Sequence, residues 1–317
     1  MNRRLELDLS KSDQIIAEDI LKVLFQIEYD KKQGDLDLIS ARIGHSREVL
    51  LKIIPSLIEK GYLKREQDVY HLTEEGERFA LLLLRAHRIC ETYLAKETGL
   101  PAGEWHVRAH EMEHKLSFGE INDLSDKLGN PRFDPHGDPI PTRDGKILEI
   151  IGTPLPDWEK GKPAVILHVE DEPEISYKKL ASANIFPGVK VKIIDKSSTI
   201  IDLLVEGMPV RIDVCDALLV SVTDVPPELE ETEDVHRLSE LECGESATIR
   251  GLLPSCMGLE RLRLLDLGIV NGSRITCEFK SVLGSPISYR VRGTLIALRK
   301  EQADRILIMK NVGKSTN

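Results

Sequence analysis

The spacing of apolar residues changes once along this 317-residue chain, and the change restricts the fold more than any other feature. Over most of the chain up to residue 116, apolar side chains recur three and four positions apart, which is typical of amphipathic helices. From Lys162 onward the apolar runs are short and alternate with polar residues, as in half-buried strands. The sequence therefore predicts an α+β multidomain protein whose helical part precedes small β-structures.

Two short helices and a hairpin are predicted between residues 36 and 73. The helices flank Gly44, and Ser46 is suited to cap the second helix through its hydroxyl oxygen. Residues 62–73 alternate and predict a two-stranded hairpin, after which a long helix begins. This order is typical of a winged helix-turn-helix, in which the second helix of the pair enters the major groove of DNA.

That second helix supplies the candidate DNA contacts. Ser46, Arg47 and Lys52 can bind phosphates or base edges of double-stranded DNA. Glu48 would repel a phosphate, and Pro55 could kink the helix. Two alternatives to DNA binding therefore stay open: a helical protein-interaction module, and a metal-sensing scaffold that does not bind DNA.

The segment HVRAHEMEH at residues 106–114 carries four metal-capable side chains at helical spacing, which at roughly 100° per residue cover about 100° of one helix face. These side chains are His106, His110, Glu113 and His114. Imidazole and carboxylate ligands without thiolate suit Fe²⁺, Mn²⁺, Zn²⁺, Co²⁺ or Ni²⁺ better than Ca²⁺ or Mg²⁺. His87 and Glu91, four positions apart in the preceding long helix, form a second candidate clamp.

The string His110-Glu111-x-x-His114 also fits the H-E-x-x-H pattern of zinc peptidases. In those enzymes the two imidazoles bind zinc and the glutamate activates water. The sequence offers no evident third ligand and no sign of a substrate cleft. A peptidase is therefore the enzymatic alternative to the expectation that this protein is not an enzyme.

The net charge of −10 at pH 7 is unevenly distributed along the chain. The excess acid lies mainly in residues 76–235, where a bound cation would reduce self-repulsion, while residues 36–65 are locally basic. No stretch approaches the roughly 20 apolar residues that cross a bilayer, and the start lacks the apolar core of a secretory signal. We therefore expect a cytoplasmic protein with no membrane partner.

Composition and periodicity together predict five segments. A winged helix-turn-helix covers residues 1–74, and a helical metal-binding domain covers residues 75–150. Two small β-barrels of SH3-like size cover residues 151–226 and 236–317. A proline- and acid-rich linker joins the barrels at residues 227–235.

Several motifs resemble those of the DtxR and MntR family of metal-dependent transcriptional repressors. Residues 113–117 match the E-H-x-x-S signature of the family's dimerisation helix, and AHRICETYL and LGNPRFDPHGDPIP look like two further family segments. Residues 236–310 are similar to the FeoA domain, which is SH3-like. The resemblance implies a homodimer that binds a palindromic operator in double-stranded DNA. It also implies that iron or manganese acts as a corepressor of metal-uptake genes.

The resemblance further implies two metal sites. The primary site would consist of Asp19, His110, Glu113 and His114. The ancillary site would consist of His87, Glu91 and His106, although manganese-type members use the position of His87 in the primary site. Iron-type members add oxygen ligands from the SH3-like domain, for which Glu172 and Glu174 are weak candidates.

Two positions depart from the family pattern. His110 stands where iron-type members commonly have cysteine and manganese-type members have glutamate. Lys22 stands where manganese-type members have a further glutamate ligand. The identity of the metal is therefore open between Fe²⁺ and Mn²⁺, with Zn²⁺, Co²⁺ or Ni²⁺ as further candidates.

Overall fold

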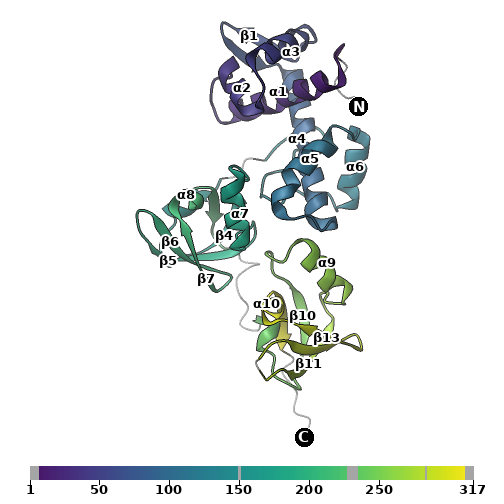
Figure 1. The fold of residues 1–317 in the computed structure, drawn as a ribbon, viewed down its shortest axis with the longest axis vertical. Helices are drawn as coiled ribbons and strands as arrows, with labels where there is room; N and C mark the ends of the chain where they lie inside the picture. Colours follow the sequence, from purple (N-terminus) through teal and green to yellow (C-terminus); the bar gives the residue numbers. More distant parts are fainter. Residues whose placement is uncertain (1–6, 149–150, 227–234, 283, 311–317) are drawn as a thin grey trace. The chain divides into compact units, whose positions relative to one another are not determined.

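The computed structural model describes residues 7–148, 151–226, 235–282 and 284–310. The chain divides into two compact units (Figure 1). The first comprises Met1–Leu94 with Glu104–Ile150, and the second comprises Ala95–Gly103 with Ile151–Asn317. Among the described residues, every helix is too short or too polar to cross a bilayer.

The first unit is built from helices and one hairpin. Its elements are α1 (Lys11–Tyr29), α2 (Leu36–Ile43), α3 (Arg47–Glu59), β1 (Leu63–Glu66), β2 (Val69–Leu72), α4 (Glu74–Glu97), α5 (Trp105–Glu113) and α6 (Phe118–Lys127). The end of α4 passes into the second unit. The α2–α3 pair followed by the antiparallel β1–β2 hairpin is the predicted winged helix-turn-helix arrangement.

Local sequence explains where these helices begin and end. Gly44 adopts a positive φ of 74° at the end of α2, a conformation that costs glycine little, and the chain then turns directly into α3. Thr73 precedes α4, and its hydroxyl oxygen accepts a hydrogen bond of 3.0 Å from the backbone N–H of Gly76. Both turns keep the recognition pair and the wing compact.

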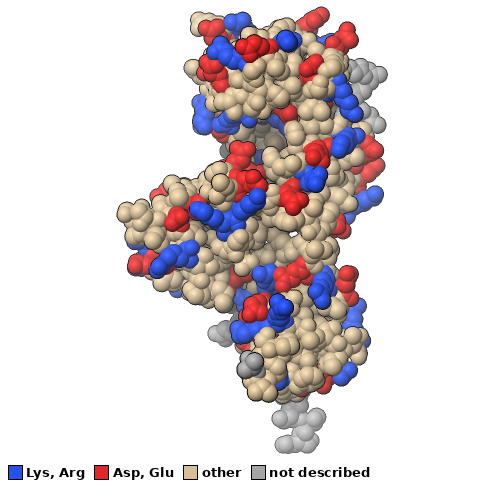
Figure 2. Space-filling model, viewed as in Figure 1, with Lys and Arg blue, Asp and Glu red and all other residues tan. Residues whose placement is uncertain are grey.

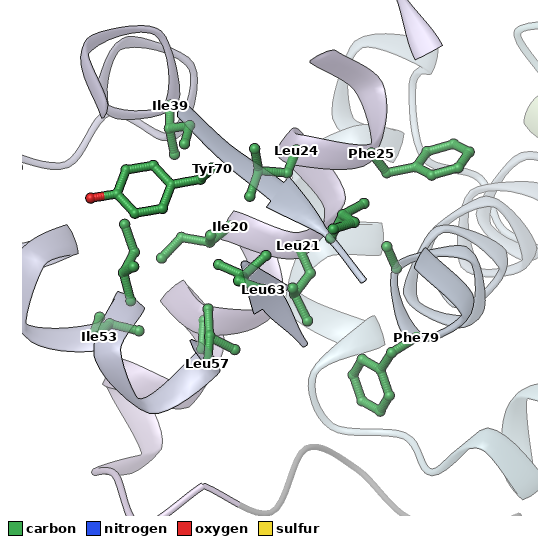
Figure 3. Close-up of a cluster of buried hydrophobic side chains, with 14 of the residues drawn as sticks. Ile20, Leu21, Leu24, Phe25, Ile39, Ile53, Leu57, Leu63, Tyr70 and Phe79 are labelled. Carbon is green, nitrogen blue, oxygen red and sulfur yellow. The ribbon is translucent and has the colours of Figure 1, made fainter. Parts of the chain in front are cut away.

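Apolar residues from α1, α2, α3, the wing and α4 form one core (Figure 3). The labelled members are Ile20, Leu21, Leu24, Phe25, Ile39, Ile53, Leu57, Leu63, Tyr70 and Phe79. Burying each aliphatic side chain of this kind contributes roughly 1.5–3 kcal/mol. The core therefore holds α1 against α3.

Pro55 lies within α3, which nevertheless runs unbroken from Arg47 to Glu59. The proline lacks the N–H that would donate to the carbonyl of Leu51, and both residues lie on the exposed face of the helix. Water can therefore hydrate the freed carbonyl, which explains why the proline does not end the helix.

The proline- and glycine-rich stretch after α6 is held against α4 by two arginines. The Arg85 guanidinium donates to the carbonyl of Pro141 at 2.8 Å and to the Ser125 hydroxyl at 3.0 Å. The Arg88 guanidinium donates to the carbonyl of Pro139 at 2.7 Å. This irregular stretch thus forms a fixed wall of the first unit.

The second unit contains two six-stranded antiparallel sheets with separate apolar cores. The first sheet has the order β3-β8-β4-β5-β6-β7. Its strands are β3 (Thr153–Pro154), β4 (Pro163–Val169), β5 (Lys190–Lys196), β6 (Ile200–Val205), β7 (Met208–Asp213) and β8 (Val220–Thr223). The helices α7 (Glu174–Ser182) and α8 (Val214–Ala217) accompany it. Helix α7 was not predicted, because only Tyr177 and Leu180 are buried along it and its apolar period is short.

The second sheet has the order β13-β12-β11-β10-β14-β9. Its strands are β9 (Val235–Arg237), β10 (Ser246–Leu252), β11 (Arg274–Lys280), β12 (Ile287–Val291), β13 (Thr294–Leu298) and β14 (Ile306–Lys310). The helices α9 (Gly258–Asp266) and α10 (Lys300–Ala303) lie between strands, and α9 was predicted. The α+β class with two small sheet modules is confirmed.

The predicted domain boundaries stay predictions. Nearly all of the linker at 227–235 lies outside the described residues, as do residues 149–150 at the predicted end of the helical domain. The two sheet modules belong to one compact unit. Within it, Arg237 of the second module donates to the carbonyl of Glu206 in the first at 2.6 Å.

Candidate metal centre

Helix α5 separates a packing face from a polar face. Trp105 and Ala109 are buried, whereas the side chains of His106 and His110 are 51% and 41% exposed. Glu113 and His114, at the end of the helix, are buried. Along the polar face of α5, the side chains of His106 and His110 are therefore partly exposed, whereas those of Glu113 and His114 are buried.

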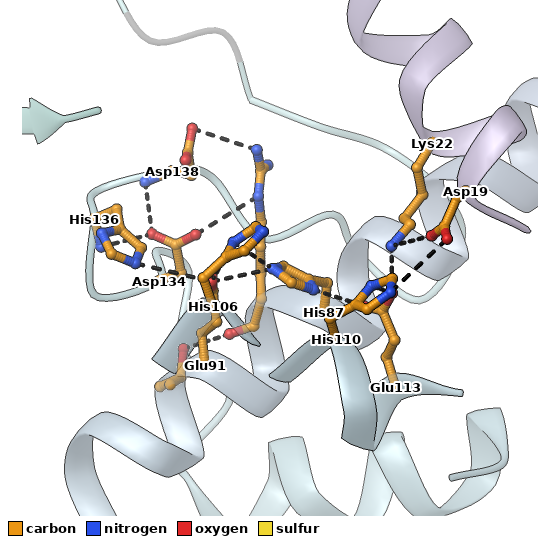
Figure 4. A network of polar contacts seen from close by, with 12 residues as sticks. Asp19, Lys22, His87, Glu91, His106, His110, Glu113, Asp134, His136 and Asp138 are labelled. Carbon is orange, nitrogen blue, oxygen red and sulfur yellow. Dashed lines mark hydrogen bonds and ion pairs between the residues drawn. The ribbon is translucent and has the colours of Figure 1, made fainter. Parts of the chain in front are cut away.

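Four of the predicted ligands converge near the C-terminal end of α5, and Figure 4 labels three of them, Asp19, His110 and Glu113. One ligand atom each from Asp19, His110, Glu113 and His114 lies within 4.8 Å of the others. His110 Nε2 lies 3.8 Å and His114 Nε2 lies 3.7 Å from the Asp19 carboxylate. Asp19 comes from α1 and the other three come from α5 or its end, so this group, here called the primary group, links two helices of the first unit.

The orientation of His114 fits a metal ligand. Its Nδ1 lies 2.6 Å from Oε2 of the buried Glu18, and with the proton on Nδ1 the imidazole presents Nε2 to a metal ion. Nε2 is buried, has no hydrogen-bond partner, and lies 3.2 Å from Oε1 of Glu113. A carboxylate–histidine pair of this kind orients an imidazole toward a cation, so the primary group fits a divalent transition metal. Glu18 was missed by sequence reasoning, and its only signal was its place beside Asp19.

The Glu113 carboxylate is fully buried and surrounded by cationic groups. The Lys22 ammonium contacts its Oε1, and His87 Nδ1 contacts its Oε2 at 2.6 Å. Burial alone would raise the pKa of Glu113, but His87 and Lys22 hold that pKa well below its usual range. Likewise, burial alone would lower the pKa of Lys22, but Glu113 and Asp19 raise it. The carboxylate is therefore ionised and available as a ligand.

The second predicted group lies between α4 and α5 and is here called the ancillary group. His87 Nε2 lies 3.0 Å from Glu91 Oε1, and His106 Nδ1 lies 3.2 Å from the same oxygen. The two imidazole nitrogens are 3.3 Å apart. The structure thus brings together all three residues of the predicted ancillary site.

His87 belongs to both groups, because each of its ring nitrogens faces a different carboxylate. Burial alone would lower its pKa, but Glu91 and Glu113 raise that pKa to about 9. In the absence of metal, His87 is therefore an imidazolium that donates to Glu113 and to Glu91. Whether His87 belongs to the primary or to the ancillary site therefore depends on which of its two ring nitrogens binds a metal ion.

A further shell of polar residues lies behind Glu91 and was also missed by sequence reasoning (Figure 4). His136 Nε2 lies 3.8 Å from Glu91 Oε1. Arg88 lies 3.6 Å from Asp134 and 3.3 Å from Asp138. Burial, with the nearby Asp138 and Glu91, holds the pKa of Asp134 well above its usual range. This shell gives Glu91 fixed surroundings.

The remaining candidate residues are Glu172 and Glu174 of the second unit and Glu111 of α5. Glu174 begins α7 in the second unit, where its carboxylate pairs with Lys178 at 2.5 Å, and Glu172 lies just before that helix. The assignment of Glu172 and Glu174 to the ancillary site stays a prediction. Glu111, the base of the peptidase alternative, is 48% exposed and pairs with Arg108 at 3.2 Å.

The candidate DNA contacts lie on the exposed face of α3. Ser46 caps α3 but makes no side-chain bond to its backbone, and Lys52 is exposed. Arg47 pairs with Asp37 of α2 at 2.7 Å, with both side chains more than half exposed. A hydrogen bond from Ser46 lowers the pKa of Glu48. Figure 2 shows basic and acidic residues interspersed on the face in view.

Two family models match the chain. Residues 73–142 match the model described as iron dependent repressor, metal binding and dimerisation domain. Residues 236–310 match the FeoA domain. The first match contains α4, α5 and His114, which together hold all the predicted ancillary ligands and three of the four predicted primary ones.

Individual relatives extend the comparison. The chain is 39% identical over 88 residues to a probable metal transport system membrane protein of Chlamydia pneumoniae, covering 28% of this chain and 20% of the relative. It is 29% identical over 126 residues to the iron-dependent repressor IdeR of Mycobacterium bovis, covering 39% and 55%. The chain thus spans a fifth to about half the length of these curated relatives.

A solved manganese-dependent transcriptional repressor in complex with manganese is also similar. It superimposes with a TM-score of 0.59 at 27% identity, over 66% of this chain and 100% of that chain. The likeness therefore extends well beyond the segment that the repressor family model matches.

Proposed function

Because the chain belongs to the DtxR and MntR family of metal-dependent transcriptional repressors and carries a FeoA domain, we propose that it is a repressor of metal-uptake genes. Divalent iron or manganese acts as its corepressor. The protein binds double-stranded operator DNA as a homodimer. Its two-fold symmetry favours a palindromic operator whose half-sites are about one DNA turn, or a multiple of one, apart.

The observation that best supports this proposal is that the predicted primary ligands come from two different helices. Asp19 lies on α1, which shares its core with the recognition helix α3, whereas the other three ligands lie on or just after α5. A bound divalent cation supplies the positive charge that joins these carboxylates and imidazoles. Through its ligands, α5 then holds α1, and with α1 the recognition helix, in one position.

The residues of the centre have separate tasks in this proposal. Glu113 supplies a buried carboxylate on α5, and Asp19 supplies a carboxylate from α1. Glu18 keeps His114 in the tautomer that binds metal. When α3 is fixed in this way in both protomers, one dimer binds both half-sites of the operator more readily.

The experiment that tests this proposal is selection of genomic DNA fragments by the purified protein. Parallel selections contain Mn²⁺, Fe²⁺ under anaerobic conditions, Zn²⁺ or a chelator, all at one ionic strength. We expect one palindromic sequence to be enriched with one metal and not with the chelator. Enrichment of no sequence under any condition would contradict the proposal and favour the metal-sensing scaffold.

Two matched glutamate variants separate the repressor from the peptidase alternative. Glu113→Gln removes a primary ligand and should abolish metal-dependent DNA binding, while Glu111→Gln should leave it intact. The reverse pattern, with hydrolysis of peptides lost in Glu111→Gln, would support a peptidase. The exposed position of Glu111 and its pairing with Arg108 argue against that role.

A further inference from the structure

Lys22 places a side-chain cation inside the primary group. It lies on α1, one helical turn after Asp19, and its Nζ is 3.1 Å from Oδ1 of Asp19. The same Nζ contacts Oε1 of Glu113 on α5 (Figure 4). The two carboxylates that a metal ion would share are therefore both bound by one ammonium.

This contact joins the same two helices that the metal would join. The Glu113 side chain is fully buried, so its negative charge requires a counter-charge nearby. His87 of α4 provides one such charge, and Lys22 provides a second from α1, across the boundary between α1 and α5. The Lys22 ammonium therefore has the same position between α1 and α5, and the same sign of charge, as the metal ion in the proposed function.

We propose that Lys22 is a built-in cation that ties α1 to α5 in the metal-free protein and must leave before a metal ion can bind the primary group. This inference rests on the proposed metal-dependent function and concerns its regulation. Lys22 thereby raises the metal concentration at which the centre fills. Lys22 also holds α1 partly in place against α5 in the metal-free protein, and a bound metal ion completes this attachment.

The geometry allows Lys22 to leave. Its side chain is 15% exposed, so a path to solvent exists beside the cluster. An ammonium on a flexible four-carbon stem can rotate away and regain hydration, whereas a guanidinium that forms two parallel bonds is harder to displace. Asp19 and Glu113 would then be free to bind the metal ion.

The competition is tested by measuring Mn²⁺ affinity with a competing metal-sensitive dye at fixed pH and ionic strength. Removing a positive charge next to the bound ion should strengthen binding, so Lys22→Met should bind Mn²⁺ at least about tenfold more tightly. Lys22→Arg keeps the charge and should bind no more tightly than the unmodified protein. Lys127→Met, at an exposed position of α6, is the matched control and should not change the affinity. Equal affinities of Lys22→Met and the unmodified protein would overturn the competition.

The tether is tested by hydrogen exchange in α1 and α5 with chelator present. Lys22→Met should exchange faster in these helices than the unmodified protein, and Lys22→Arg should restore most of the protection. Unchanged exchange in Lys22→Met would overturn the tether.

A measurement on the unmodified protein covers the case in which Lys22→Met fails to fold. Amine acetylation, read by mass spectrometry, should leave Lys22 protected in chelator and make it more reactive when Mn²⁺ is added. Lys127 should react equally in both conditions. Equal protection of Lys22 with and without bound Mn²⁺ would overturn the inference.

Failure of this inference differs from failure of the proposed function. If the unmodified protein selects DNA with metal but Lys22→Met leaves Mn²⁺ affinity unchanged, only the role of Lys22 is wrong. If Lys22→Met binds Mn²⁺ more tightly but no variant selects DNA, the role of Lys22 stands and the repressor function is wrong.

Discussion

At the scale of single residues, the centre is a network in which histidines and carboxylates compensate one another's charge. His87 bridges Glu91 and Glu113, and Lys22 bridges Asp19 and Glu113. Each of these charges therefore has a partner of opposite sign without a bound ion. A metal ion has to displace these partners, so metal affinity is coupled to their protons and positions.

The raised pKa of His87 predicts how the stability of the metal-free protein depends on pH. Its pKa is about 9 in the folded protein against an ordinary 6.5, so its stabilisation is complete below pH 6.5 and disappears as pH rises through 9. The free energy of unfolding in chelator should fall by roughly 3 kcal/mol over that range. Urea unfolding at several pH values measures it, and His87→Gln should flatten the profile. A flat profile for the unmodified protein would show that His87 is not cationic.

We expect Glu18 to affect metal affinity although it is not itself a predicted ligand. Its carboxylate holds His114 Nδ1, so Glu18→Ala should lower Mn²⁺ affinity about 10- to 100-fold. Asp123→Ala removes an equal charge from the exposed face of α6 and serves as the control. Both variants are titrated with Mn²⁺ against a competing dye. Equal affinities of the two would remove Glu18 from the centre.

At the scale of elements, α1 joins the core of the DNA-binding module to the metal centre. Ile20, Leu21 and Leu24 face that core, while Asp19 and Lys22 lie at the centre. In the proposed function, a helix with two such faces transmits a change in cation binding to α3.

The exposed face of α3 predicts a separation of DNA binding from stability. Lys52→Ala should weaken operator and non-specific DNA binding alike and reduce the salt dependence by about one counterion. It should leave the unfolding free energy nearly unchanged, because Lys52 is exposed. Ile53→Ala, one residue later and buried, should instead destabilise the protein by about 2–5 kcal/mol. Fluorescence anisotropy across a salt series, together with urea unfolding, measures both. If the salt dependence of Lys52→Ala is unchanged, DNA binds at a surface that does not include Lys52.

At the scale of the whole molecule, the proposed function makes metal and DNA two ligands of one conformational equilibrium. If metal raises operator affinity by some factor, the operator must raise metal affinity by the same factor. Factors of about 5–150 are typical of such couplings. Metal titrations with operator, with scrambled DNA and without DNA measure the second factor directly. Unequal factors at equilibrium would mean that a further reaction, such as a change in oligomeric state, accompanies binding.

The sequence by itself determined most of the elements and the chemistry of the candidate ligands, although helix α6 was not predicted. Apolar residues at helical spacing in α1 and α3, a glycine after α2 and alternating runs in the sheets are local signals, because they depend on neighbours along the chain. The imidazole and carboxylate stripe on α5 is local for the same reason. Helix α7 was missed because its local signal is weak.

Only the tertiary structure decided which distant residues share the buried end of the centre. Glu18 and Lys22 reach Glu113 and His114 from α1, about ninety positions away in sequence, because one core joins α1 to α4 and to Phe118 of α6. His136 reaches Glu91 because Arg85 and Arg88 hold the stretch after α6 against α4. These contacts depend on packing between elements, for which no local pattern exists, and they set the charge balance that a metal ion meets.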